Sequence, residues 1–144
     1  MVRVMPVDRL TDEEVREILT KYRKIALVGA SPKPERDSNE VMSYLIEKGY
    51  EVYPVNPRYS KILGRKCYLS VLDISDDVEI VDLFVRPEFT MDYVEQAIKK
   101  GAKVVWFQFN TYNQEAFRKA KEAGLMAVAH RCIKREHQRL KPTK

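Results

Sequence analysis

Short apolar runs alternate with helical stretches along most of this 144-residue chain, and this alternation constrains the fold most strongly. The five runs of strand length are Ile25–Val28, Tyr50–Val55, Ile80–Val85, Val104–Phe107 and Met126–Ala129. The stretches between them, about 39–48, 88–100 and 114–123, have helical spacing of their apolar residues. Alternating strands and helices with short connections produce parallel strands and right-handed crossovers. The pattern predicts an α/β, Rossmann-like, doubly wound and mostly parallel sheet of about five strands with helices on both faces.

Turn and cap residues support the same boundaries. Thr11 and Glu14 form a candidate capping box, which predicts an N-terminal helix within residues 1–22 that packs on the sheet. Pro87 stands at the start of a predicted helix, where its missing N–H is tolerated. Three glycines follow predicted helices, where a left-handed cap favours glycine; they are Gly49, Gly101 and Gly124. In the irregular segment 58–74 we expect a loop, a short extended piece and one helical turn.

Composition narrows the classes of protein to which the chain can belong. The length fits one domain over residues 1–144. The formal net charge is +5, but the sequence has no long Lys/Arg blocks of the kind found in nucleic-acid-binding arms. The sequence has no apolar run near the length of a membrane span, and Met1–Asp8 is too short and polar for a signal peptide. Cys67 and Cys132 make no disulfide framework. We therefore expect a cytoplasmic protein, with the basic end 134–144 forming a solvated helix end and tail.

Ligands of open α/β sheets bind outside the carboxyl ends of the strands. Four segments follow predicted strands: 29–36, 56–58, 86–88 and 108–110. The first three of these segments contain Arg or Lys. Basic side chains from separate loops would converge at one edge of the sheet. An anionic ligand is therefore expected there.

The first of these loops disfavours NAD. A dinucleotide fingerprint has three glycines after the first strand and an acidic residue about 20 residues later for the ribose. Here only Gly29 is retained, because Ser31 and Pro34 occupy the other two glycine positions. The second strand ends in Val55 and Asn56, without an acidic residue.

The residues that replace the fingerprint suit a ligand with several phosphates. Ser31, the following backbone N–H groups and a helix that begins near residues 38–39 can donate hydrogen bonds to phosphate oxygens. Lys33, Arg36 and Arg58 add positive charge.

Several motifs in order resemble the CoA-binding domain family, which consists of small stand-alone proteins similar to the N-terminal domains of the succinyl-CoA synthetase α subunit and of NDP-forming acyl-CoA synthetases. The resemblance covers Arg23 to Lys134. Its motifs are Ile25–Arg36 (IALVGASPKPER), Val55-Asn56-Pro57-Arg58 followed by Gly64, Val85-Arg86-Pro87-Glu88, Gly101-Ala102-Lys103 leading to Trp106-Phe107-Gln108, and Met126–Lys134 with Arg131-Cys132.

The resemblance implies that coenzyme A (CoA) lies across the strand ends. By position, Gly29, Ala30, Ser31, Pro32 and Lys33 would cradle the phosphates. Asn56, Pro57 and Arg58 would lie near the adenosine. Val85, Arg86 and Pro87 would line the path of the adenine or the pantetheine. The stretch Trp106–Phe109, including Gln108 and Phe109, would line the next part of the ligand. Arg58 and Arg36 are the candidates for the 3′-phosphate. Relatives that ligate CoA carry a phosphorylatable histidine in a separate downstream domain, so we expect no complete ligase chemistry here.

Catalytic and metal sites receive less support from the residues. Cys132, among basic neighbours, is either a reactive thiol able to form a mixed disulfide with CoA or a buried thiol at a strand end. His130, Cys132 and His137 match no common zinc spacing, and no triad or carboxylate pair stands out. Trp106 and Phe107 alternate along a strand, so at least one is expected in the core.

We therefore expect a protein that binds CoA or acyl-CoA as a carrier, a sensor or a CoA-presenting subunit, without complete catalytic machinery. We expect it to bind no metal, nucleic acid or membrane. It would act alone, as a homo-oligomer or with a ligase partner subunit. The alternatives are an NADP-dependent oxidoreductase and an interaction subunit of an acyl-CoA ligase.

Overall fold

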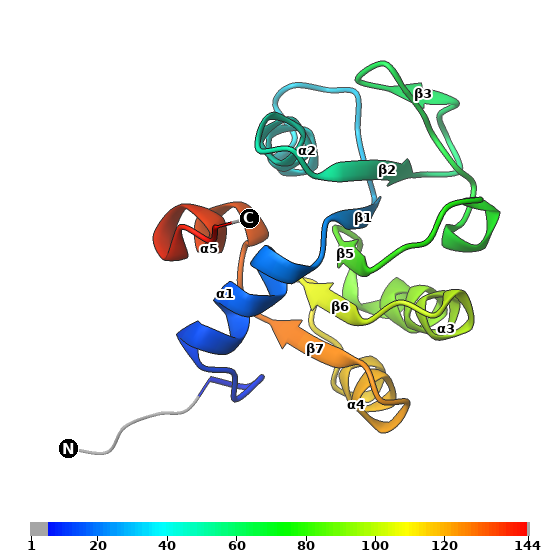
Figure 1. Ribbon diagram of the computed structural model, residues 1–144. Coiled ribbons are helices and arrows are strands. Elements are labelled where there is room, and N and C mark those ends of the chain that lie inside the picture. The colour runs from blue at the N-terminus through cyan, green and yellow to red at the C-terminus, as the bar shows by residue number, and fades with distance from the viewer. Residues whose placement is uncertain (1–5, 144) are drawn as a thin grey trace.

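The computed structural model describes residues 6–143 and contains a five-stranded parallel sheet between two layers of helices (Figure 1). The strands of this sheet are β1 (Lys24–Val28), β2 (Glu51–Val55), β5 (Ile80–Leu83), β6 (Val104–Phe107) and β7 (Met126–Ala129). Their spatial order is β2-β1-β5-β6-β7, and every neighbouring pair is parallel. The predicted fold class and all five predicted strand runs are confirmed, although β5 ends two residues earlier than expected.

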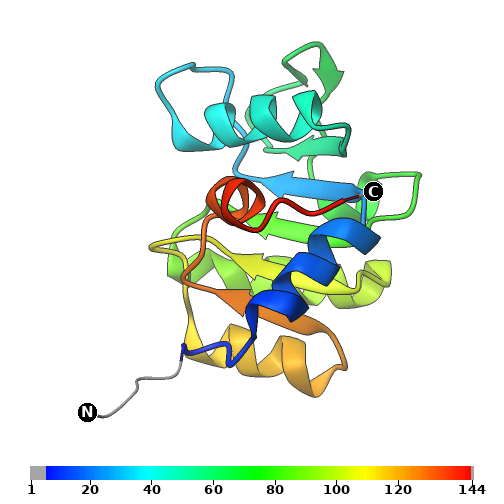
Figure 2. The same ribbon diagram turned by 60° about the vertical axis from the view of Figure 1, so that its left-hand side comes forward.

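One layer contains α1 (Asp12–Lys21), α2 (Asp37–Glu47) and α5 (Ile133–Leu140), and the other contains α3 (Thr90–Lys100) and α4 (Gln114–Glu122) (Figures 1 and 2). Apolar side chains on the two faces of the sheet pack into two separate core clusters, one beneath each layer. Because both faces are covered, the strands are apolar throughout rather than alternating. Within residues 6–143, no helix has the length and apolar character needed to cross a bilayer.

The local signals in the sequence specify most boundaries. Thr11 and Glu14 form the predicted capping box of α1, and Gly49, Gly101 and Gly124 all have positive φ. The segment 58–74 contains a hairpin of β3 (Lys61–Ile62) and β4 (Arg65–Lys66), followed by the 3-10 turn η1 (Val71–Asp73). Pro87 begins a second 3-10 turn, η2 (Pro87–Phe89), directly before α3.

The N-terminal helix, Asp12–Lys21, lies within the predicted segment 1–22 and begins directly after the Thr11 cap, as expected. Residues 1–5 lie outside the described residues, as does Lys144 at the other end. The basic end forms a helix, as expected, but only one of its faces is solvated, because α5 buries Ile133, Glu136 and Leu140 against α1 and α2. Arg135 and Arg139 are exposed and Lys134 is half-buried, so the basic composition concealed an amphipathic helix.

Candidate functional site

A cavity of about 600 Å³ lies at the carboxyl ends of β1 and β5, where the chain reverses its direction of strand addition. Such a reversal leaves a crevice between neighbouring loops, and ligands of doubly wound sheets bind there. We call this space the central cavity. It is lined by Gly29, Ala30, Ser31, Lys33, Glu35, Arg36, Asp37, Ser38, Asn56, Arg58, Tyr59 and Phe84.

Gly29 opens the cavity by letting two loops approach closely. Its φ is +84°, and a Cβ atom added there would lie 2.4 Å from the carbonyl oxygen of Phe84. No other residue type fits this space without moving the backbone. The single glycine retained from the dinucleotide fingerprint is therefore required by the close passage of the β1 and β5 loops.

Hydrogen bonds between loops hold the cavity wall in place. The Asn56 Nδ2 donates to the Ala30 carbonyl at 2.8 Å, and its Oδ1 accepts from the Arg58 N–H at 2.9 Å. The Ser31 carbonyl accepts from the Asn39 Nδ2 at 2.9 Å, while its Oγ accepts from the Lys33 N–H at 3.1 Å. Asn56 therefore joins the β1 and β2 loops, and the Ser31 O–H keeps its proton available for a ligand.

The charge of the cavity is less positive than the sequence suggested. Lys33, Arg36 and Arg58 are exposed, and none forms an ion pair within residues 6–143. Glu35 and Asp37, which the sequence did not indicate as site residues, line the same space. Three cations and two carboxylates leave one net positive charge, beside the N-terminal end of α2.

Two smaller cavities adjoin the central one. The β2-side cavity, of about 320 Å³, shares Gly29, Asn56 and Arg58 with it and is otherwise lined by Val55, Pro57, Val85, Phe89, Asp92, Tyr93 and Gln96. The α5-side cavity, of about 230 Å³, shares Asp37 and Phe84 with it and is otherwise lined by Glu40, Val41, Gln108, Phe109, Asn110, Cys132, Lys134, Arg135 and Gln138. The three spaces follow the carboxyl edge of the sheet from β2 to β6.

Most of the predicted site residues line one of these three spaces, with five exceptions: Trp106 and Phe107, which lie in the core, and three residues nearer the surface. Pro32 and Arg86 are exposed and Pro87 is half-buried, and none of the three lines a described cavity. The Arg86 guanidinium instead lies 3.8 Å from the Glu88 carboxylate on the surface.

The two aromatic residues at the end of β6 lie in the core. Trp106 and Phe107 are both 0% exposed, on opposite faces of the sheet, and the Trp106 Nε1 donates to the Arg131 carbonyl at 2.8 Å. Their predicted place along a ligand is therefore wrong, because no ligand reaches a side chain with no exposed surface. The exposed aromatic residue of this stretch is Phe109, at 49%.

The histidines occupy separate environments. The His137 Nδ1 shares a hydrogen bond of 2.8 Å with the Tyr44 hydroxyl, and burial lowers the pKa of its imidazole. His130 instead packs on Tyr112. Within residues 6–143, no group of three His, Cys, Asp or Glu side chains is placed to hold a metal.

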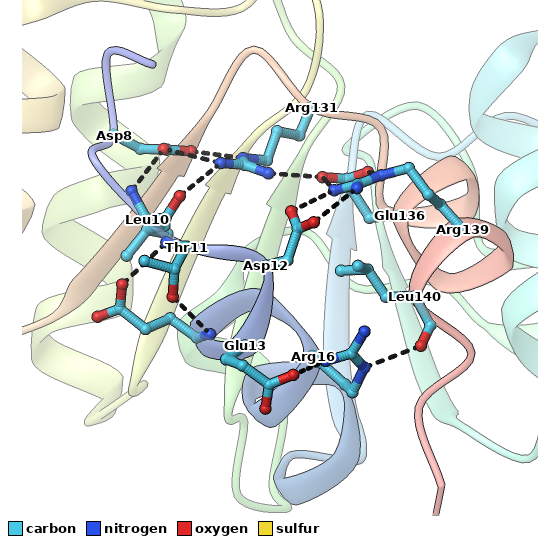
Figure 3. Close-up of polar contacts among 11 residues, drawn as sticks. Asp8, Leu10, Thr11, Asp12, Glu13, Arg16, Arg131, Glu136, Arg139 and Leu140 are labelled. Carbon is cyan, nitrogen blue, oxygen red and sulfur yellow. Dashed lines mark hydrogen bonds and ion pairs between the residues drawn. The ribbon is translucent and has the colours of Figure 1, made fainter. Parts of the chain in front are cut away.

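A buried network of ion pairs joins the N-terminal segment to α5 (Figure 3). The Asp8 carboxylate accepts from Nε and Nη2 of Arg131 at 2.8 and 3.2 Å, and from the Ala129 N–H at 3.1 Å. The Arg131 Nη1 also donates to Glu136 at 2.7 Å, and Glu136 accepts from Arg139. Burial alone would raise the pKa of Asp8, but the bonds from Arg131 and the backbone hold that pKa below its ordinary value.

This network fixes the turn that carries Cys132. Arg131 precedes Cys132, and Cys132 is the N-cap residue of α5. A fourth cavity, of about 1070 Å³, lies beside the network and shares Phe109, Cys132 and Arg135 with the α5-side cavity.

Sequence reasoning also missed Asp82. It lies in the middle of β5, is 0% exposed, and neither carboxylate oxygen has a hydrogen-bond partner among the described residues. Burial raises the pKa of this carboxyl well above its ordinary value. The sequence did contain a signal for this residue, because Asp82 is an acidic residue within an otherwise apolar predicted strand.

Comparison with known proteins adds independent information. A family model described as a CoA binding domain matches residues 23–138. A solved structure of a hypothetical protein from Pyrococcus horikoshii OT3 superposes with a TM-score of 0.96 and 71% identity, covering 98% of this chain and 99% of that one. Protein YneT of Bacillus subtilis (strain 168) is 36% identical over 124 residues, which are 86% of this chain and 92% of YneT.

Larger relatives contain only a part that matches. The α subunit of ADP-forming acetate–CoA ligase I from Pyrococcus furiosus is 40% identical over 95 residues, which are 62% of this chain and 21% of that subunit. The chain therefore spans about a fifth of this ligase subunit.

Proposed function

The chain belongs to the CoA-binding domain family, and on that premise we propose that it binds CoA, or a CoA derivative, across the carboxyl ends of its strands. It does so in the cytoplasm as a carrier, a sensor or a CoA-presenting subunit. The observation that carries the proposal is the central cavity, where Lys33, Arg36 and Arg58 extend without ion-pair partners around the N-terminal end of α2. Unpaired bases beside free helix N–H groups are the arrangement that a polyphosphate requires.

We infer an orientation of the ligand from the three adjoining cavities. The phosphates occupy the central cavity, between Lys33 and Arg58. The adenine enters the β2-side cavity, where Pro57, Val85 and Phe89 supply apolar contact. The pantetheine arm extends into the α5-side cavity past Phe84. The 3′-phosphate of CoA then lies near Arg58, the base that lines both the central and the β2-side cavities.

Isothermal titration calorimetry with CoA, dephospho-CoA, NADP and NAD tests this assignment. We expect CoA to bind most tightly and dephospho-CoA distinctly more weakly. Lys33→Ala and Arg58→Ala should each weaken CoA binding by about 1–3 kcal/mol through a lost charge-assisted hydrogen bond. Lys103→Ala, at an exposed base directly before β6 and therefore at the amino edge of the sheet, is the matched control and should change nothing. NADP binding as tight as CoA binding, or full affinity in both site variants, would refute the assignment.

The match to a ligase subunit supports one specific role within this proposal, that of a subunit presenting CoA to a partner. Tagged protein isolated from native lysate, with the bound proteins identified by mass spectrometry, separates this role from a free-standing sensor. Recovery of the remaining subunits of an acyl-CoA ligase would support the subunit role, and recovery of the protein alone with CoA would support the sensor.

A further inference from the structure

The α5-side cavity contains a donor group that has no acceptor among residues 6–143. Gln108 is 3% exposed and lines this cavity directly after β6. Its Oε1 accepts from the Ile133 N–H at 3.0 Å, which fixes the carboxamide. Its Nε2 donates to no described residue, so both of its N–H groups are available to a ligand. The Nε2 is not among the fully buried atoms of the described residues, so it faces the open space of the cavity, where the amide or thioester carbonyl of a ligand is a suitable acceptor.

The same cavity contains a thiol. Cys132 lines it from the start of α5, is half-buried and has no disulfide partner. The N-terminal end of α5 and the exposed Arg135 place positive potential beside the sulfur. The other thiol, Cys67, is a natural comparison: it is 7% exposed, its Sγ donates to the Asn56 carbonyl at 3.4 Å, and burial raises its pKa.

The position of this cavity relates the thiol to the proposed ligand. Asp37 and Phe84 line both the α5-side and the central cavities, so the two spaces are neighbours along the sheet edge. A CoA molecule with its phosphates at Lys33 directs its pantetheine amides past Gln108 and its sulfur toward Cys132.

We propose that Cys132 is a thiol–disulfide exchange site that takes disulfides of CoA as its substrate, with Gln108 binding the pantetheine arm; this inference rests on the proposed CoA site. The Cys132 thiolate attacks the sulfur attached to the bound CoA. The Cys132–S–S–CoA bond forms as the original disulfide bond breaks, and the departing thiolate takes up the proton that Cys132 lost. Cys132 is oxidised, the CoA disulfide is reduced to one free thiol, and no further oxidant is needed.

Intact-mass spectrometry after incubation of the reduced protein with CoA disulfide tests the exchange. Wild type and Cys67→Ser should each gain one CoA moiety, and Cys132→Ser should gain none. Tandem mass spectrometry of the wild-type adduct should place it on Cys132, which locates the site even if Cys132→Ser does not fold. The rate should exceed that with pantethine, the disulfide without adenosine phosphates, by about tenfold or more, and adenosine 3′,5′-bisphosphate should suppress the difference.

A parallel titration of reduced wild-type protein with reduced CoA separates the two proposals. Tight binding of reduced CoA together with no adduct from CoA disulfide, an adduct on Cys67, or equal rates with CoA disulfide and pantethine would overturn the exchange and leave the proposed function standing. Absence of CoA binding would overturn the proposed function itself. Gln108→Leu should slow adduct formation about tenfold while leaving the reaction of Cys132 with a small disulfide unchanged.

Discussion

At Gly29 the backbone turns with φ +84° directly beneath the carbonyl of Phe84, which belongs to the loop after the neighbouring strand. The contact joins the two loops at the reversal of strand order, where the central cavity opens. Any Cβ at this position would push apart the two loops that line the cavity.

Gly29→Ala should therefore lower both stability and CoA affinity. Gly124→Ala provides the control, because its φ is +91° but no atom lies within 4 Å of an added Cβ. The control should cost about 1 kcal/mol of unfolding free energy from backbone strain alone. Gly29→Ala should cost at least about 2 kcal/mol more, because of overpacking. Urea denaturation measures both variants, and equal losses would contradict the steric explanation.

Asp82 presents the opposite situation, a residue whose chemistry does not fit its surroundings. Its carboxyl has neither exposed surface nor a partner among the described residues. Burial favours the protonated form and raises its pKa. The folded state therefore retains a proton that the unfolded chain releases above about pH 3.9.

This difference predicts a stability that falls with increasing pH. A raised folded-state pKa stabilises the fold below the unfolded pKa, and the contribution is lost as pH rises toward the folded value. As the pH rises above about 3.9, the unfolding free energy of wild type should fall, relative to Asp82→Asn, by up to about 1.4 kcal/mol per pH unit. Asp73→Asn, at an exposed carboxyl, is the control and should parallel wild type. Urea denaturation at several pH values is the measurement, and parallel curves for Asp82→Asn and wild type would contradict the prediction.

At this scale the sequence predicts backbone requirements better than side-chain environments. Gly29 was identifiable because a glycine directly after a strand indicates a tight turn, and this signal is local in the sequence. Trp106 was placed near a ligand by position alone, whereas its burial depends on how α1 and α5 cover that face. Glu35 and Asp37 were missed because the neighbouring bases suggested one sign of charge for the whole loop.

At the scale of elements, the N-terminal segment and α5 stabilise each other through charges rather than through apolar area alone. Arg131 binds Asp8 on one side and Glu136 on the other, and Arg139 extends the network to Asp12 at the start of α1 (Figure 3). The helical pattern of α5 was obscured in the sequence, because its buried Glu136 is as polar as its exposed residues. Only the tertiary partner makes this glutamate a core residue.

Asp8→Asn should destabilise the protein by about 3–5 kcal/mol at neutral pH, because it leaves Arg131 buried without its main counter-charge. Asp12→Asn, which loses an exposed pair with Arg139, should cost much less. The pKa of Asp8 is depressed in the folded state, so its contribution is complete above about pH 3.9 and is lost as pH falls through the folded value. Denaturation curves should therefore show wild type and Asp8→Asn converging in acid. A constant difference down to pH 2 would argue against the ion pair as the cause.

For the whole molecule, the two helical layers leave the carboxyl edge of the sheet as the place where loops from separate strands meet. The alternation of strands and helices predicted this edge, since topology follows from periodicity and right-handed crossovers. The division of the edge into three adjoining cavities could not be predicted. It depends on side chains such as Phe84 and Phe109, whose directions are set by packing between distant elements.

Hydrogen–deuterium exchange tests whether the edge acts as one binding surface. Saturation with CoA should slow exchange in the loops after β1, β2, β5 and β6, which line the cavities, and at the start of α2. The exposed turns that precede the strands, including the turn at Gly101 before β6, should exchange as in the free protein. Ligand binding also stabilises the native state by about 2.7 kcal/mol at 100 times Kd, so buried strand amides that exchange only by global unfolding should slow uniformly. Protection confined to one loop would show that CoA occupies a single cavity, and protection centred on the amino ends would place the ligand elsewhere.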